Sequence, residues 1–309
     1  MILSVSRRTD IPAFYSEWFF NRIKEGFVYV RNPMNIHCIS HIPINKDVVD
    51  GIVFWSKNPS VMMSRLDELS EFNYYFQFTV NSYNQHIETN VPEKKHVINT
   101  FKRLSDLISP KRVIWRYDPI LITSDINLEY HTKYFEVLAK ELKGFTNLCM
   151  ISFVDFYKKT ERNLRSIEAR ELTENEIHTV AQKFVEICQV YNLKIQTCAE
   201  KINLDSYGIK HGRCIDNELI EEISNSRLEV TKDKNQRDEC GCISSIDIGE
   251  YNTCRHNCLY CYANFNKCEV DKKFAKHNSL GPLLVGEVGE KDIVKERNVN
   301  TLINNNSLF

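Results

Sequence analysis

Six short apolar runs, each followed by a segment with helical spacing, constrain the fold of this chain more than any other feature. The runs cover residues 2–5, 51–55, 74–80, 113–115, 148–154 and 194–197. Such alternation is typical of repeated βα units, in which parallel strands form one sheet and helices cover it. No glycine-rich phosphate-binding turn follows the first run. We therefore expect an α/β protein with a full or partial TIM-type (β/α) barrel rather than an open doubly wound sheet.

Start and stop signals support the helices between these runs. Asp10 and Pro12 are typical of a helix N-terminus, and Gly26 is typical of a helix end. Thr173 and Glu176 have the spacing of a capping box, which predicts a helix that runs to about residue 191. Helical spacing predicts further helices over residues 61–69, 95–107 and 128–142.

The charge balance limits the class of partner. The chain has 309 residues, of which 40 are basic and 41 acidic, so its net charge is -1. This composition gives no whole-chain basic field for non-specific nucleic-acid binding, although it is compatible with a local basic cleft. Charged residues interrupt the N-terminal apolar run too early for a secretory signal, and no apolar run is long enough to span a bilayer. We expect a cytoplasmic protein with no membrane partner.

Cysteines are concentrated towards the C-terminal end of the chain. Six of the 11 lie within residues 240–268. In a reducing cytoplasm, cysteines gathered in this way are more often metal ligands or reactive thiols than disulfides. We therefore expect a barrel body over residues 1–239, a cysteine-rich cluster segment over 240–268 and a cover or tail over 269–309. The chain from residue 264 onward is polar, and we expect it to be poor in helix.

Cys254, Cys258 and Cys261 form a CxxxCxxC motif, which is the strongest functional signal in the sequence. Three thiolates at this spacing can bind three corners of an iron–sulfur cubane and leave the fourth iron open. Ferredoxin sites use four cysteines, and zinc ribbons use two CxxC pairs with a long spacer. The alternatives are three unligated cysteines or a zinc site completed by His256 or Cys268. Residues 243–248 are a candidate strand that would carry this loop to the barrel mouth.

With Tyr260 before its last cysteine, this motif resembles the cluster loop of the radical SAM superfamily. The extension Tyr262-Ala263-Asn264 is similar to the branch that includes spore photoproduct lyase. The whole chain, from SRRTDIP through HGRCID to the late cysteines, is similar to a bacterial and archaeal family of unknown function in which the motif follows the barrel strands. In most radical SAM enzymes the motif instead follows the first strand. No glycine-glycine-glutamate motif is found.

The resemblance implies a chemistry. The three cysteines would hold a [4Fe-4S] cluster whose open iron chelates S-adenosylmethionine (SAM). Reductive cleavage of SAM would give a 5'-deoxyadenosyl radical, which abstracts a hydrogen atom from the substrate. Ferredoxin or flavodoxin would supply the electron. The substrate class stays open among a small molecule, a peptide and a nucleic-acid lesion.

Polar residues follow all six predicted strands, and the chemistry of a βα barrel takes place at the C-terminal strand ends. They are Ser6, Arg7, Arg8, Asp10, Ser56, Lys57, Asn58, Asn81, Arg116, Asp118, Asp155, Cys198 and Glu200. We expect the cofactor and a polar or anionic substrate to be bound by Arg7, Arg8, Lys57, Arg116 and Glu200, together with Tyr260. Guanidinium and ammonium groups are suited to carboxylate or phosphate. The competing interpretation is that each cation only pairs with a neighbouring acid.

Four further cysteines stand apart from the motif. Cys198 and Cys214 follow the sixth run, and Cys240 and Cys242 precede the motif. They are candidates for a second iron–sulfur cluster or a zinc ion. Alternatively, Cys198 or Cys214 is a thiol that donates a hydrogen atom to a substrate radical, or simply a packed core residue.

Two other classes of function are compatible with this sequence. One is a non-catalytic zinc-binding module that binds nucleic acid through its basic strand-end loops. The other is a barrel enzyme that uses Asp118 and Asp155 as acid and base, with a purely structural cluster.

Overall fold

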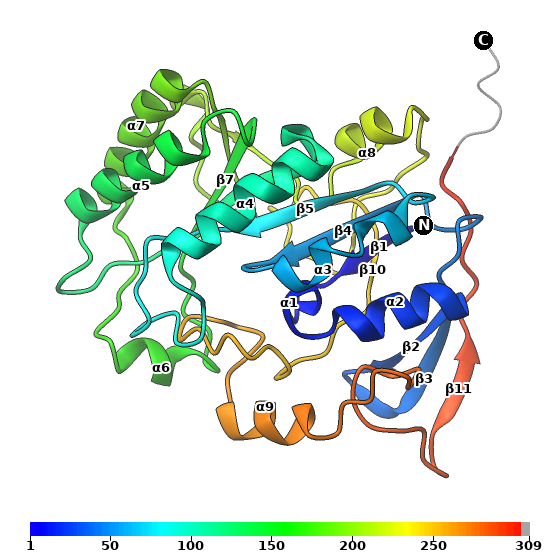
Figure 1. The fold of residues 1–309 in the computed structure, drawn as a ribbon. Coiled ribbons are helices and arrows are strands. Elements are labelled where there is room, and N and C mark those ends of the chain that lie inside the picture. Colours follow the sequence, from blue (N-terminus) through cyan, green and yellow to red (C-terminus); the bar gives the residue numbers. More distant parts are fainter. Residues whose placement is uncertain (304–309) are drawn as a thin grey trace.

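An eight-stranded parallel sheet lies at the centre of the computed structural model, which describes residues 1–303 (Figure 1). From one edge to the other its strands are β10 (Ile246–Asp247), β1 (Ile2–Val5), β4 (Gly51–Ser56), β5 (Tyr74–Thr79), β6 (Val113–Ile120), β7 (Leu148–Phe153), β8 (Lys194–Thr197) and β9 (Lys210–His211). Every neighbouring pair is parallel. The six predicted runs are strands, and the fold is an α/β fold compatible with a full or partial TIM-type barrel.

The two edges of the sheet are the short strands β9 and β10, and the chain next to them is in contact. Ile243, just before β10, donates its backbone N–H to the carbonyl of Ile215, just after β9, at 3.3 Å. We call residues 212–216 and 240–243 the seam. The candidate strand over 243–248 is present as β10, and it pairs with β1 from Leu3 and Ser4.

Helices cover one side of the sheet, where α4, α5 and α7 lie next to one another (Figure 1). The helices are α1 (Ile11–Phe14), α2 (Ser16–Glu25), α3 (Ser60–Met63), α4 (Lys94–Ile108), α5 (Leu128–Leu142), α6 (Glu161–Arg165), α7 (Glu174–Tyr191), α8 (Asn217–Ser224) and α9 (Lys267–Phe274). Short 3-10 turns cover Leu66–Leu69, Pro110–Arg112 and Asp205–Tyr207. Asp10 caps α1, and the capping box of Thr173 and Glu176 opens α7, both as predicted. The helix expected over 61–69 is split into α3 and a 3-10 turn.

The two faces of the sheet have different neighbours, because successive side chains along a strand point to opposite faces. One face packs against the helices, where Trp115 of β6 stacks on Phe135 of α5 with ring centroids 4.9 Å apart. The other face contributes Tyr75 and Met150 to a separate buried cluster. That second cluster also contains Cys214, Cys240 and Cys242. The seam and α8, whose Ile220 belongs to this second cluster, therefore cover the other face of the sheet.

The sequence analysis missed a second sheet. It consists of β2 (Phe27–Asn32), β3 (Asn35–Pro43) and β11 (Ile293–Glu296), with β3 in the middle. The β2–β3 hairpin lies between α2 and β4 in the chain. Strand β11, near the other end of the chain, pairs in parallel with β3. Figure 1 shows this small sheet beside α2 and away from the main helical layer.

Within residues 265–303 the chain forms one α-helix, α9, which was not predicted from the sequence. Asn266 caps the eight-residue helix α9, and the side-chain oxygen of Asn266 accepts a hydrogen bond from the backbone N–H of Glu269. The predicted tail also supplies β11, so its described part is tied to the body. Residues 304–309, which begin with three asparagines, lie outside the described residues.

Within residues 1–303, no helix combines the length and apolar character needed to cross a bilayer.

Candidate functional site

One cavity of about 390 Å³ lies at the C-terminal ends of the parallel strands. This volume is in the range of small-molecule sites. Among the residues that line it are all of the predicted site residues: Arg7, Arg8, Lys57, Arg116, Asp118, Asp155, Cys198, Glu200, Cys214, Cys240, Cys242, Cys254, Cys258, Tyr260 and Cys261. Strand ends, the seam and the loop before α9 thus meet at one place.

Cys254, Cys258 and Cys261, which we call the loop group, lie on the connection between β10 and α9. The loop is held in shape by its own backbone, since Cys261 donates its N–H to the carbonyl of Cys258 at 3.1 Å. The side chain of Asn264 donates to the carbonyl of Cys254 at 2.6 Å. Burial raises the pKa of all three thiols, to about 12 for Cys258. Without a metal or a cation these thiols therefore stay protonated near neutral pH.

Lys57 faces this loop but its charge is paired. Its ammonium donates to the buried carboxylate of Glu88 at 2.8 Å, and Lys94 and the hydroxyl of Tyr260 bind the same carboxylate. Burial raises the pKa of Glu88, but the two ammonium groups outweigh it and hold that pKa at about 2. The nearby Lys57 ammonium also lowers the pKa of Cys258 against the effect of burial. Lys57 therefore belongs to a buried ion-pair network, and its charge only partly offsets the effect of burial on the pKa of Cys258.

A second polar link holds the loop to the start of α1. The carboxylate of Asp10 accepts hydrogen bonds from the Ser56 hydroxyl and the Lys57 backbone N–H, each at 2.8 Å. Nε2 of His256 lies 2.8 Å from the same carboxylate. The other ring nitrogen of His256 is buried and has no hydrogen-bond partner among the described residues. Asp10 therefore joins β1, β4 and the cysteine loop at the rim of the cavity.

Arg7 and Arg8 follow β1 and lie near Asp247 of β10. The Asp247 carboxylate accepts the Arg7 backbone N–H at 2.8 Å and lies 3.9 Å from Nε of Arg8. The guanidinium of Arg7 lies over the Trp55 ring and 3.8 Å from Asp233. One of its terminal nitrogens is buried without a partner in the described part of the chain. Arg7 thus retains a hydrogen-bond donor for another group.

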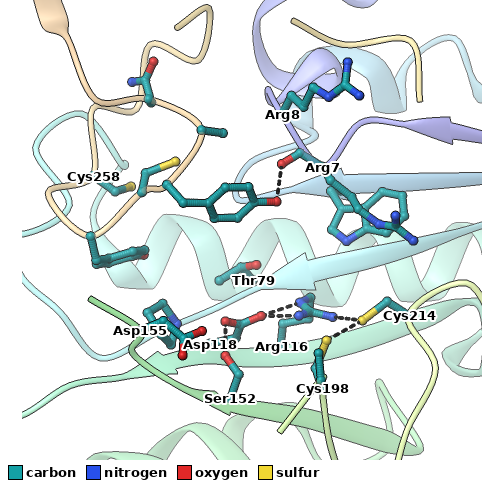
Figure 2. Close-up of a pocket in the computed structure, with 18 of the residues that line it drawn as sticks. Arg7, Arg8, Thr79, Arg116, Asp118, Ser152, Asp155, Cys198, Cys214 and Cys258 are labelled. Atoms are coloured by element: carbon teal, nitrogen blue, oxygen red, sulfur yellow. Dashed lines mark hydrogen bonds and ion pairs between the residues drawn. The ribbon is translucent and has the colours of Figure 1, made fainter. Parts of the chain in front are cut away.

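Arg116 lies between Asp118 and Cys214 (Figure 2). Its Nε donates to Asp118 at 2.9 Å, and Nη1 donates to the sulfur of Cys214 at 2.8 Å. Ser152 also donates to Asp118. Burial raises the pKa of Asp118, but Arg116 and Ser152 more than offset this and hold the pKa below its ordinary value. Arg116 is therefore already paired with an acid, as the competing interpretation expected.

The other two carboxylates of the cavity differ from Asp118. Asp155 is exposed and binds Nη2 of Arg237 at 2.6 Å. Glu200 accepts the backbone N–H of Phe153 at 2.8 Å, and burial raises the pKa of Glu200 to about 8. Glu200 is thus the carboxyl in this cavity whose proton can be lost or gained near neutral pH. Asp118 is less suited to an acid or base role, because Arg116 and Ser152 favour its carboxylate form.

Cys198, Cys214, Cys240 and Cys242, which we call the seam group, come from three separate segments. The sulfurs of Cys198 and Cys214 are 2.8 Å apart. Cys214, Cys240 and Cys242 belong to one buried cluster, and Cys198 packs against it. The four cysteines that the sequence left scattered are therefore adjacent in space.

The donor sets distinguish a cluster from a single ion. No three His, Cys, Asp or Glu side chains within residues 1–303 are arranged as ligands of one metal ion. This does not test a cubane, because each cysteine of a cubane binds a different iron. A zinc site completed by Cys268 is disfavoured, since Cys268 is exposed on α9, whereas His256 keeps a buried ring nitrogen without a partner among the described residues. The all-thiol loop group, on one loop facing the cavity, fits a [4Fe-4S] cluster.

Sequence reasoning missed several residues that organise this site. Glu88 and Ser152 belong to no recognisable sequence motif. Glu88 accepts a hydrogen bond from Lys57, and Ser152 donates one to Asp118. Asp247 lies within the candidate strand over residues 243–248 and was not predicted to be a site residue. A signal for it does exist, since an acid placed among apolar and small strand residues needs polar partners. Ser4 of β1 and Ser6, which directly follows β1, provide them at 2.7 and 2.6 Å.

Comparison with protein families identifies the group to which this chain belongs. Residues 2–263 match the family described as a domain of unknown function, DUF1848. The chain belongs to the DUF1848 family. The matched region of this DUF1848 chain contains every cysteine of the loop group and of the seam group.

Other comparisons add little. No curated protein matches the chain. One solved structure, from Bacteroides thetaiotaomicron VPI-5482 and classed provisionally as an alpha-L-fucosidase, is 9% identical, with a TM-score of 0.26. The match covers 74% of this chain and 84% of that one. A TM-score this low does not establish a common fold.

Proposed function

We propose that this protein is a radical SAM enzyme whose loop group, Cys254, Cys258 and Cys261, holds a [4Fe-4S] cluster. The observation that carries the proposal is that the CxxxCxxC loop lines the same cavity as the C-terminal strand ends. Bound there, the cluster would supply one-electron cleavage of SAM to methionine and a 5'-deoxyadenosyl radical. The similarity of the motif to those of radical SAM enzymes and spore photoproduct lyase supports the same chemistry.

The residues around the loop would prepare it for the cluster. Lys57 brings a positive charge towards Cys258, which favours the thiolate that binds iron. Glu88 holds both Lys57 and Tyr260, and so fixes the loop against the end of β5. His256 and Asp10 fix the other side of the loop to α1. These contacts bury polar groups at the cost of desolvation, an arrangement that is common at functional sites.

The cavity beside the loop would bind SAM and a polar or anionic substrate. Arg7 has an unused buried donor for such a ligand, and Arg8 lies next to it on the same connection. Glu200 would give or take a proton near neutral pH. Ferredoxin or flavodoxin would supply the electron, and the substrate would be a small molecule, a peptide or a nucleic-acid lesion. We place the protein in the cytoplasm, where a reduced cluster is maintained.

The test is anaerobic purification, cluster reconstitution and electron paramagnetic resonance of the reduced protein with and without SAM. A mass-spectrometric assay for 5'-deoxyadenosine follows. We expect a [4Fe-4S] signal that changes on adding SAM, together with 5'-deoxyadenosine formation. Cys258→Ala should lose both, whereas Cys268→Ala, which changes an exposed cysteine outside the cavity, should keep both.

Two results would reject this proposal in favour of a rival. A colourless protein with stoichiometric zinc and no response to SAM would favour a zinc-binding module with a basic nucleic-acid cleft. A cluster whose signal ignores SAM, with no 5'-deoxyadenosine formed, would favour a barrel enzyme with a structural cluster.

A further inference from the structure

We infer that the seam group, Cys198, Cys214, Cys240 and Cys242, is the ligand set of a second metal centre. Three of the four side chains are at least nine-tenths buried, and all four line the cavity. The sulfurs of Cys198 and Cys214 are 2.8 Å apart, and Cys214, Cys240 and Cys242 belong to one buried cluster against which Cys198 packs. This inference does not depend on the radical chemistry proposed for the loop group.

The fold builds this arrangement from segments that are far apart in sequence. Cys214 is fixed by its carbonyl, which accepts the hydroxyl of Tyr75 at 2.7 Å and the amide of Gln77 at 2.9 Å. Gly212 lets the loop approach the sheet, because a Cβ there would lie 2.6 Å from Met150. The carbonyl of Cys242 accepts the backbone N–H of Asp233 at 3.0 Å. Buried polar side chains of β5 are thus committed to holding a cysteine loop.

The groups around the sulfurs are hydrogen-bond donors and cations. Arg116 donates to the sulfur of Cys214 at 2.8 Å, and the backbone N–H of Ile215 donates to the sulfur of Cys242 at 3.4 Å. The guanidinium of Arg7, with its unpartnered buried nitrogen, lies on the same side of the cavity. Four thiolates bound to a metal carry net negative charge, which these hydrogen-bond donors would stabilise. Four neutral thiols would need no such surroundings.

The donor set selects the class of metal. Four thiolates without a carboxylate or an imidazole are suited to zinc or to an iron–sulfur cluster. No three of these sulfurs within residues 1–303 already surround one ion, so the cysteine side chains would have to rotate to bind the metal. Figure 2 shows Cys198 and Cys214 across the cavity from Cys258, with Arg116 beside them. The two metal centres would therefore face one ligand space from opposite sides.

The experiment measures iron, zinc and acid-labile sulfide per chain in the full-length protein, purified anaerobically and reconstituted. Cys242→Ser and Cys198→Ser each remove one seam ligand from a different segment, and Cys268→Ser is the matched control. We expect both seam variants to lose about four irons with their sulfide, or about one zinc, relative to wild type. The metal that disappears identifies the centre. The control should lose none.

Failure of this inference is distinguishable from failure of the proposed function. The seam variants should keep the iron held by the loop group, whereas Cys258→Ala should lose that iron and keep the metal of the seam. Circular dichroism checks folding, and half-exposed Cys198 provides the second variant if Cys242→Ser does not fold. Unchanged metal content in a folded seam variant would overturn the inference. Metal-free wild type with a Cys198–Cys214 disulfide, detected by alkylation and mass spectrometry, would also overturn it.

Discussion

The loop group and the seam group are both made of cysteines, but the chain assembles them in different ways. The loop group lies within residues 254–261, on a single connection. The seam group spans residues 198–242 and joins the segments that follow β8 and β9 with the one that precedes β10. A motif of the first kind is visible in sequence because its geometry is local. A site of the second kind exists only when the edges of the sheet come together.

The largest expected effect concerns the support of the loop group. Glu88→Gln would leave Lys57 and the partly exposed Lys94 without their buried carboxylate, and removing one partner of a buried pair costs about 3–5 kcal/mol. Urea unfolding measures this loss. We expect weaker cluster binding by the loop group and unchanged metal in the seam group. Equal loss from both groups would show that they are not separate units.

The next effect sets a reference outside both groups. His131 is buried, its ring contacts the hydroxyl of Tyr117 at 2.8 Å, and burial lowers its pKa to about 4. The unfolded chain therefore binds more protons than the folded one between pH 6.5 and 4. The stabilisation is complete above pH 6.5 and is lost as the pH falls, by about 3 kcal/mol. Chemical unfolding at several pH values should show this decline, and His131→Gln should flatten it.

Two glycines sharpen the comparison directly. A Cβ at Gly249, before the cysteine loop, would lie 2.6 Å from Cβ of Ser6, which cannot move away without the backbone. A Cβ at Gly212, in the seam, would meet the flexible end of Met150. We expect Gly249→Ala to cost about 3 kcal/mol and Gly212→Ala about 1 kcal/mol of unfolding free energy. The reverse order in thermal or urea unfolding would contradict this.

The smallest effect should leave both groups intact. Thr173 caps α7, and Glu176 completes the capping box far from either set of cysteines. Thr173→Ala should cost about 1 kcal/mol in urea unfolding. Metal content per chain should equal that of wild type, and a loss of metal would mean that the sites respond to general destabilisation.

Most of the main sheet could be predicted from sequence because its signals are local. The runs at residues 2–5 and 194–197 are strands with the predicted bounds, and α5 has the predicted bounds of 128–142. The second sheet could not be predicted in this way, since β11 pairs with β3 across most of the chain. The alternation of the β2–β3 hairpin was a usable signal, but the count of βα units left no place for it.

The candidate site divides along the same line. The strand-end residues and the CxxxCxxC loop could be recognised from the sequence. A parallel sheet brings the C-terminal ends of its strands to the same side, and the motif needs only its own spacing. The pairing of Lys57 with Glu88 and of Arg116 with Asp118 depends on the tertiary structure. The tertiary structure also brings the four cysteines of the seam group, which come from separate segments of the chain, to one cavity. Such contacts depend on how the chain closes around the sheet, and no local pattern of residues encodes that closure.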